Sequence, residues 1–265
     1  MNQAEKAGRE MDAIHEMASG ASPIHRLSPG AKLLLTVSFI MIVLSFPKYQ
    51  LTGLFFFVLF PVIGYQVADI PVSTCFRKLW VVLPLVCAVG IFNPFFDRKI
   101  LAVIAGIKIS GGVISMLSLM LKGVFCLMTS FLLVATTTIE EICAALRKIH
   151  CPKMLTALLL LTFRYVHVLL EEVSLMTDAY HLRAPHQKGI HHSAWGSFLG
   201  QLILRTADRG SMLYESMILR GFHGEFLYGE NKKYSRLSWL VAGFVLLLMI
   251  GARLVDLTAL LGSLL

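Results

Sequence analysis

The sequence predicts an all-α, polytopic helical integral membrane protein with a cytoplasmic helical domain inserted before its last span. Hydrophobic residues make up 56% of the 265 residues and charged residues only 15%, and the mean hydropathy is +0.72. A soluble domain is about 45–50% apolar and about 25% charged, so this chain has too little charge to cover a water-facing surface. Several apolar runs approach the ~20 residues that a bilayer span needs. Between residues 139 and 237 charge is concentrated and the apolar spacing is helical.

Residues 1–30 predict a polar, amphipathic arm on the cytoplasmic side. Acidic and basic residues are mixed there, for example Lys6, Arg9 and Glu10, and the first apolar run begins too late for a secretory signal peptide.

Residues 31–138 predict about four spans. The first two runs, Ala31–Phe46 and Leu51–Ala68, are separated by a four-residue polar turn, which is typical of a helical hairpin. The third run, Leu79–Phe92, contains Pro84, where we expect a kink.

The fourth span is Gly111–Thr138, the longest apolar segment, in which Lys122 is the one charged residue. The β-branched run that precedes it, Ile100–Ile109, is too short to cross a bilayer. It predicts a small outer hairpin near residues 94–110.

Residues 139–237 hold 12 of the 24 Lys and Arg, 9 of the 16 Asp and Glu, and 7 of the 9 His. Helices are expected at Glu140–Ile149, Lys153–Leu182 and Ala194–Arg220, joined between the last two by a loop at Pro185–Ser193. Gly221 follows the last of these helices, where a left-handed residue commonly ends a helix.

The segment Lys153–Leu170 is apolar enough to raise the question of another span. Arg164 lies within it, and a charged side chain near the centre of a spanning helix costs on the order of 3 kcal/mol. This cost favours a helix that lies under or partly in the bilayer, and a true span is the alternative.

The last span is Ser238–Leu261, within residues 238–265. The distribution of Lys and Arg near the span ends favours a cytoplasmic amino terminus, because positive charge accumulates in cytoplasmic loops. With that orientation the inner set is Arg26, Lys32, Arg77, Lys78, Arg147, Lys148, Lys153, Lys232, Lys233 and Arg236, against an outer set of Lys48, Arg98, Lys99, Lys108 and Arg253. About five spans are expected in total.

The sequence contains no P-loop, no H-E-x-x-H and no G-x-S-x-G, so it predicts a non-catalytic membrane subunit rather than an enzyme. The net charge of +8 fits the positive-inside excess of a membrane protein, and no nucleic-acid partner is expected. The five cysteines are scattered, which indicates neither a disulfide framework nor a zinc site.

Two rival functions are compatible with a polytopic helical chain. A stand-alone secondary transporter of a small ion or metabolite usually needs polar groups at mid-membrane, which the spans hardly offer. A membrane enzyme, or a metal site, would depend on His186, His191 and His192, with His181 nearby. A solvated loop is the simpler interpretation of these histidines.

Two arginines, Arg183 and Arg220, end the two long helices of this domain. A guanidinium presents a rigid fork of donors that can pair with a carboxylate of a partner through two hydrogen bonds. Taken alone, each residue is explained more simply as a solvated surface arginine or as a cation that stabilises a helix carboxyl terminus.

A family resemblance favours the interpretation that the two arginines bind a partner protein. Leu219-Arg220-Gly221-Phe222 resembles the Ala-Arg-Gly signature of the transmembrane (T) components of energy-coupling factor (ECF) transporters, and His181-Leu182-Arg183-Ala184 lies where that family has its other arginine motif. At this first motif Leu182 precedes the arginine and Ala184-Pro185 follow it, where the family usually has small or basic residues. Three more segments resemble the cobalt-transport branch, the CbiQ proteins: Ser22–Lys32, Phe92–Arg98 and Leu161–Tyr165. The similarity extends from about Ser22 to Gly224.

The resemblance implies a membrane scaffold that holds a substrate-binding (S) component, a cobalt-type membrane subunit, and rests on two ATP-binding ECF/ABC ATPase subunits. Residues 139–237 would be the coupling helices, and the ATPase-coupling residues carried over are Leu182, Arg183, Ala184, Leu219, Arg220 and Gly221. ATP would bind to the partners, and this chain is expected to hold no cofactor. The implied function is import of cobalt, with nickel second, across the cell (inner) membrane of a bacterium or archaeon, in contact with membrane lipid.

Overall fold

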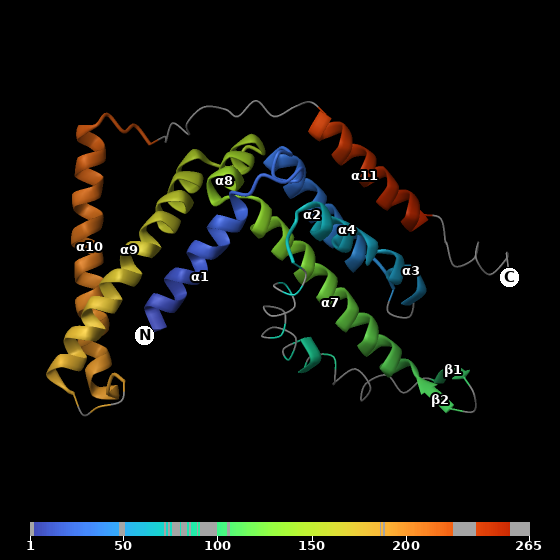
Figure 1. Ribbon diagram of the computed structural model, residues 1–265, viewed down its shortest axis with the longest axis horizontal. Helices are drawn as coiled ribbons and strands as arrows, with labels where there is room; N and C mark the ends of the chain where they lie inside the picture. Colours follow the sequence, from blue (N-terminus) through green and yellow to red (C-terminus); the bar gives the residue numbers. More distant parts are fainter. Residues whose placement is uncertain are drawn as a thin grey trace. The chain divides into compact units, whose positions relative to one another are not determined.

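The computed structural model describes residues 3–47, 51–71, 73, 75, 80, 84, 86–88, 90, 100–104, 107–185, 187, 189–224 and 237–254. Within these residues the chain is helical apart from one small β-hairpin (Figure 1). Contacts divide the chain into two compact units. The first unit comprises Met1–Met17 and Ile139–Asn231, and the second comprises Ala18–Thr138 and Lys232–Leu265. The boundary at Ile139 coincides with the increase in charge along the sequence.

The second unit contains the apolar helices and the hairpin. Its elements are α2 (Pro29–Leu44), α3 (Leu51–Phe56), α4 (Leu59–Val67), β1 (Ile100–Ile104), β2 (Ile107–Ser110), α7 (Gly111–Thr136) and α11 (Leu237–Leu254). The strands pair antiparallel, so the short β-branched run forms the hairpin that it predicts, and the side of the membrane on which it lies stays a prediction. The expected span at Leu79–Phe92 lies largely outside the described residues, as do the Phe92–Arg98 motif and the end of the last span.

The predicted helix at Leu51–Ala68 is interrupted, and its halves are α3 and α4. Pro61 explains the interruption, because proline has no N–H and its ring clashes with the carbonyl four residues earlier, here that of Phe57. At the break the N–H of Phe57 and the N–H of Val58 donate to carbonyls three residues back, those of Leu54 and Phe55, at 3.1 and 3.2 Å. The predicted run is therefore helical on both sides of a short turn at Phe57 and Val58.

Side-chain contacts give the relative directions of α2, α7 and α11. Lys32 Nζ donates to Thr136 O at 2.7 Å, and Lys122 Nζ donates to Phe46 O at 2.6 Å, so α2 and α7 run antiparallel. The carboxyl end of α11 meets that of α2 through Arg253, which donates to Ser45 O at 3.3 Å. Helices α2 and α11 therefore run parallel to each other.

The same bonds explain the charged groups among the apolar helices. Lys32 is only 6% exposed, and a buried ammonium group needs hydrogen-bond acceptors to offset the loss of water. Lys122 binds the carbonyl of Phe46, beyond the carboxyl end of α2, where unpaired carbonyls favour a cation. The buried hydroxyl of Tyr65 donates in the same way to Met128 O at 2.9 Å and thereby joins α4 to α7.

The first unit contains α8 (Ile139–Lys148), α9 (Lys153–Arg183), the short η1 (His192–Ala194) and α10 (Trp195–Leu219), together with most of α1 (Gln3–Ala18). Helices α8, α9 and α10 lie within one residue of their predicted bounds. Asp12 of α1 lies 3.6 Å from the ring of His167 on α9, between Oδ1 and Nδ1. In α8 the side chain of Cys143 is buried, and this burial raises the pKa of its thiol.

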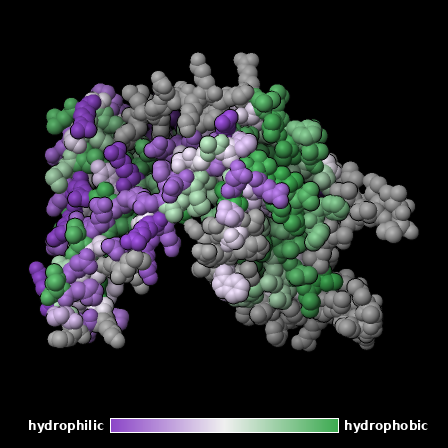
Figure 2. Space-filling model, in the orientation of Figure 1, coloured by the Kyte–Doolittle hydropathy of each residue, from purple (hydrophilic) through white to green (hydrophobic). Residues whose placement is uncertain are grey.

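Two described helices, α7 and α9, are long and apolar enough to cross a bilayer, as judged by length and composition. Three shorter apolar helices accompany them, at Pro29–Leu44, Gly53–Val67 and Leu237–Arg253. Hydrophobic side chains predominate on the surface over the second unit, whereas many hydrophilic ones cover the first (Figure 2). The fold is that of a helical membrane protein, and the placement of α9 beneath the bilayer stays a prediction.

Candidate functional site

The carboxyl end of α10 closes in a regular helix-ending motif that presents Arg220. Gly221 has a φ of +79°, which places it in the left-handed region. The N–H of Gly221 donates to Ile218 O at 2.9 Å, and the N–H of Phe222 donates to Met217 O at 3.0 Å. These two bonds define a Schellman motif, in which glycine adopts the left-handed conformation without steric cost. The position predicted for Gly221 is confirmed.

The carboxyl end of α9 is built differently. Arg183 is the last helical residue, and Ala184, which follows it, has φ −131° and ψ 65°. Pro185 then occupies the position that Gly221 holds in α10. Proline cannot adopt a positive φ and has no N–H to donate, so the same motif cannot form here. The two helix ends thus present their arginines on different backbone supports.

Both arginines are exposed, and each follows a leucine with unusually high exposure. Leu182 is 84% exposed and Leu219 is 87% exposed, the two highest values among the described large apolar side chains. An apolar side chain so fully in water gains from burial against a partner. Each tip, defined as Leu182-Arg183-Ala184 and Leu219-Arg220-Gly221, therefore combines a free apolar group with a cationic fork.

The two tips lie at opposite ends of the helix pair. Helix α10 returns in the direction opposite to α9, from a loop at the end of α9 (Figure 1). An ion pair between Arg205 and Glu172 joins the two helices near their middles. With 25 residues, α10 is about 37 Å long, so its length sets the separation of the tips.

Among the described residues of the intervening loop, the histidines make local contacts. No group of three or more His, Cys, Asp or Glu suited to a metal ion occurs among the described residues. The side chain of His191 instead accepts from Ser193 N–H at 3.3 Å and so caps η1. His186 lies outside the described part of the chain.

Sequence reasoning overlooked the role of Tyr180 in this loop. Its hydroxyl donates to Gln187 Oε1 at 2.7 Å and accepts from the N–H of His191 at 3.2 Å. No local sequence signal indicates such contacts, because they depend on how the loop folds back over the end of α9.

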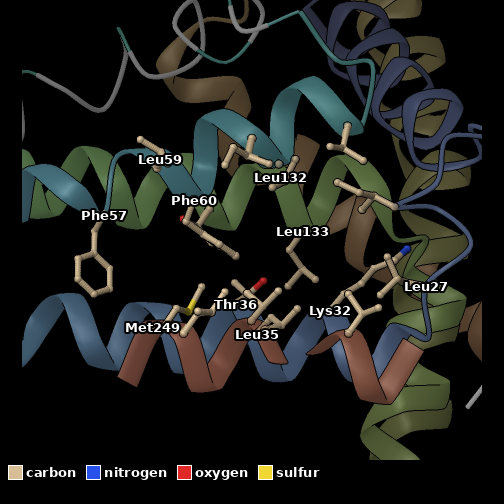
Figure 3. A pocket seen from close by; sticks show the side chains of 18 of the residues that line it. Leu27, Lys32, Leu35, Thr36, Phe57, Leu59, Phe60, Leu132, Leu133 and Met249 are labelled. Carbon is tan, nitrogen blue, oxygen red and sulfur yellow. The ribbon is translucent and has the colours of Figure 1, made fainter. Parts of the chain in front are cut away.

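A cavity of about 490 Å³ lies within the second unit, between α2, α4, α7 and α11. Figure 3 shows Phe60 and Leu133 projecting towards Thr36 and Met249. The polar side chains among its described lining residues are Lys32, Thr36, Thr129 and Thr136. The hydroxyls of Thr129 and Thr136 already donate to carbonyls one turn earlier. A transition-metal ion prefers imidazole, thiolate or carboxylate ligands, so this lining suits an apolar occupant.

A family model described as "Cobalt transport protein", CbiQ, matches residues 20–234. The match includes both arginine tips and α2 to α10 of the described helices.

Three similar proteins show what the chain resembles beyond the family model. An uncharacterized protein of Methanocaldococcus jannaschii is 23% identical over 212 residues, covering 75% of this chain and 72% of that protein. The nickel permease LarQ of Lactiplantibacillus plantarum is 26% identical over 98 residues, covering 37% of this chain and 36% of LarQ. The energy-coupling factor transporter transmembrane protein EcfT of Lactococcus lactis subsp. cremoris is 26% identical over 246 residues, covering 86% of this chain and 92% of EcfT.

Proposed function

The chain belongs to the CbiQ family of cobalt transport proteins, and from this membership we propose that it is the coupling subunit of an ATP-driven importer for cobalt or nickel. Family membership makes it a transmembrane permease component of the ECF type rather than a catalytic enzyme. The proposal adds that it connects a pair of ATPases to a separate substrate-binding S component in the membrane.

The exposure of the two tips is the observation that supports this proposal best. Leu182 and Leu219 are largely exposed and immediately precede Arg183 and Arg220, each at the end of a long helix. Interfaces derive most of their binding energy from a few residues, among which arginine is common, that become fully desolvated on binding. Two such tips about 37 Å apart suit the two equivalent docking sites of a two-fold ATPase pair.

The ion itself would meet another subunit. The cavity of the second unit is lined mainly by apolar side chains and by Lys32, whose positive charge repels a divalent cation. Closing and opening of the ATPase dimer would move the tips and, through α9 and α10, reorient the substrate-binding subunit. This chain would transmit motion without binding ATP or holding a cofactor.

The proposed location is the cell membrane, with several spans and a cytoplasmic amino terminus. The charge asymmetry of the sequence supports this orientation. Since α2 and α11 run parallel and α7 antiparallel, the start of α2, the end of α7 and the start of α11 share one membrane face. The proposal places residues 139–237 on the cytoplasmic side, which the charge asymmetry of the sequence supports.

Replacing both arginines tests the docking directly. Arg183→Ala together with Arg220→Ala should leave the protein in the membrane, because both side chains are exposed at helix ends. Each replacement should weaken ATPase binding by roughly thirtyfold if the arginines are energetically dominant contacts. Copurification of the ATPases and uptake of Co²⁺ or Ni²⁺ by the whole complex would measure the effect.

A matched control is available on the same two helices. Arg164→Ala with Arg209→Ala removes the same charge from exposed positions away from the tips, and should retain the ATPases and transport. Equal losses in the two double variants would show a general charge effect and contradict docking at the tips. Transport of either ion in liposomes that contain this chain alone would contradict the division of labour and favour the stand-alone transporter.

A further inference from the structure

The three helix ends at α4, α8 and α10 share a feature that the end of α9 lacks. Asp69, His150 and Gly221 follow these helices with φ values of 55°, 67° and 79°. In each case the next residue donates its N–H to a carbonyl five positions earlier, at 3.0 to 3.2 Å. These bonds close the last turn and fix the direction in which the chain leaves.

Pro185 prevents this closure after Arg183, so the following loop needs another support. Loops of this kind are mobile unless hydrogen bonds or packing restrain them. Within the described residues the loop has a backbone bond of its own, from the N–H of Gln187 to Ala184 O at 3.1 Å, and its restraint from a side chain of α9 is the hydroxyl of Tyr180, three residues before Arg183. It donates to Gln187 Oε1 at 2.7 Å and accepts the N–H of His191 at 3.2 Å, while the Tyr180 carbonyl accepts the N–H of Ala184 at 3.0 Å.

The network continues from Tyr180 to the start of α10. His191, whose N–H is bound by the Tyr180 hydroxyl, caps η1 through its ring nitrogen, and η1 leads directly into Trp195. One side chain on the last turn of α9 thus connects the Arg183 tip with the first turn of the next helix.

We propose that Tyr180 is the positioning residue of the Arg183 tip. Its hydroxyl restrains the chain that follows α9, as the left-handed conformation of Gly221 restrains the chain that follows α10. The proposal rests on the function proposed above and adds a residue to it. Tyr180 does not touch the ATPase in this scheme. It holds the loop behind Arg183 and Leu182 in one conformation, so that less conformational entropy is lost when the tip docks.

Tyr180→Phe removes the hydroxyl alone and tests the restraint without any partner. Amide hydrogen exchange in the purified chain should become about three- to tenfold faster between residues 184 and 193, as expected from the loss of one or two net hydrogen bonds. Exchange around residues 216–224 should not change. Tyr214→Phe, at a 59% exposed tyrosine on α10, is the matched control and should leave both segments as they are. Unchanged exchange at 184–193 in the Tyr180 variant would overturn the proposal.

A double-mutant cycle on ATPase copurification tests whether Tyr180 acts through Arg183. Tyr180→Phe should reduce binding about three- to tenfold in the unmodified chain and in the Arg220→Ala chain. In the Arg183→Ala chain it should cause little further loss, because the group that it positions is gone. A full additional loss in that background would show that Tyr180 acts elsewhere and would overturn the proposal.

The two proposals fail in different ways. If the Arg183→Ala, Arg220→Ala double variant keeps its ATPases, the docking function is wrong whatever Tyr180 does to the loop. If the arginine variants lose their ATPases and Tyr180→Phe shows no coupling to Arg183, the docking stands and only the role of Tyr180 is wrong.

Discussion

Glycine at position 221 determines how α10 ends, because its φ of +79° suits glycine far better than residues with a Cβ. No atom lies within 4 Å of where a Cβ would be added, so substitution meets no clash with neighbours. The cost of a larger residue here is therefore one of backbone conformation alone.

Gly221→Ala should destabilise the end of α10 by about 1 kcal/mol. Hydrogen exchange of residues 216–222 would detect the fraying of the last turn. Gly210→Ala is the matched control, since Gly210 lies inside α10 with open space around it and alanine favours a helix by up to about 1 kcal/mol. Similar effects of the two substitutions, instead of effects of opposite sign, would contradict the left-handed cap.

At this scale the sequence predicts the helix-ending residues well and the loop contacts poorly. Arg183, Arg220 and Gly221 could be placed because helix ends follow from local residue types. The exposure of Leu182 and Leu219 could not, because it depends on what the neighbouring helices leave uncovered. The Tyr180 contacts also depend on tertiary folding, so no local sequence pattern indicates them.

The pair α4 and α7 illustrates how a small residue brings two helices together. A Cβ at Gly64 would lie 2.5 Å from Cδ2 of Leu132, closer than carbon atoms approach without displacement. Small residues at such positions allow the close packing on which helix association in membranes depends. The close approach also brings the Tyr65 hydroxyl within reach of the Met128 carbonyl.

Gly64→Ala should lower the stability of the second unit by about 1 kcal/mol, the low end of the cost of overpacking, because the end of the Leu132 side chain has to move aside. Thermal unfolding in detergent would measure the change, with Gly243→Ala on α11, where the space is open, as the control that reports the gain in helix propensity alone. Leu132→Ala should lower the stability less in the Gly64→Ala chain than in the unmodified chain, because the methyl group added at position 64 fills part of the space that the leucine side chain leaves. Strict additivity of the two substitutions would contradict direct packing of Gly64 on Leu132.

The elements themselves follow largely from apolar periodicity and composition. Helices α2, α7, α8, α9 and α10 were predictable because long, periodic or uniformly apolar segments leave few alternatives. The interruption between α3 and α4 was missed although Pro61 signals it, since its effect falls on the carbonyl of Phe57 rather than on the proline itself.

For the whole molecule, the proposed topology places the two chain termini on opposite sides of the membrane. The positive-inside rule places the amino terminus in the cytoplasm. A chain with five spans, an odd number, then ends on the outer side. Fusions of a fluorescent protein to the amino terminus and of alkaline phosphatase to the carboxyl terminus should both be active, since the first reporter works inside the cell and the second outside. An inactive carboxyl-terminal phosphatase would contradict the odd number of spans.

The division into two units was partly visible in the sequence, because charge rises sharply at Ile139. The assignment of Met1–Met17 to the unit that contains α9 was not. That assignment depends on contacts between residues more than 150 positions apart, such as Asp12 with His167, which composition cannot reveal.

The length of α10 has a consequence for how a complex with the proposed ATPases would persist. Two separate attachment points on one stiff rod behave as a bivalent ligand, because engagement of the first holds the second at a high local concentration. Either contact can then be weak enough to release and rebind within each cycle while the assembly as a whole stays together. A helix of about 37 Å would thus keep the ATPases attached while each single contact is free to dissociate and rebind.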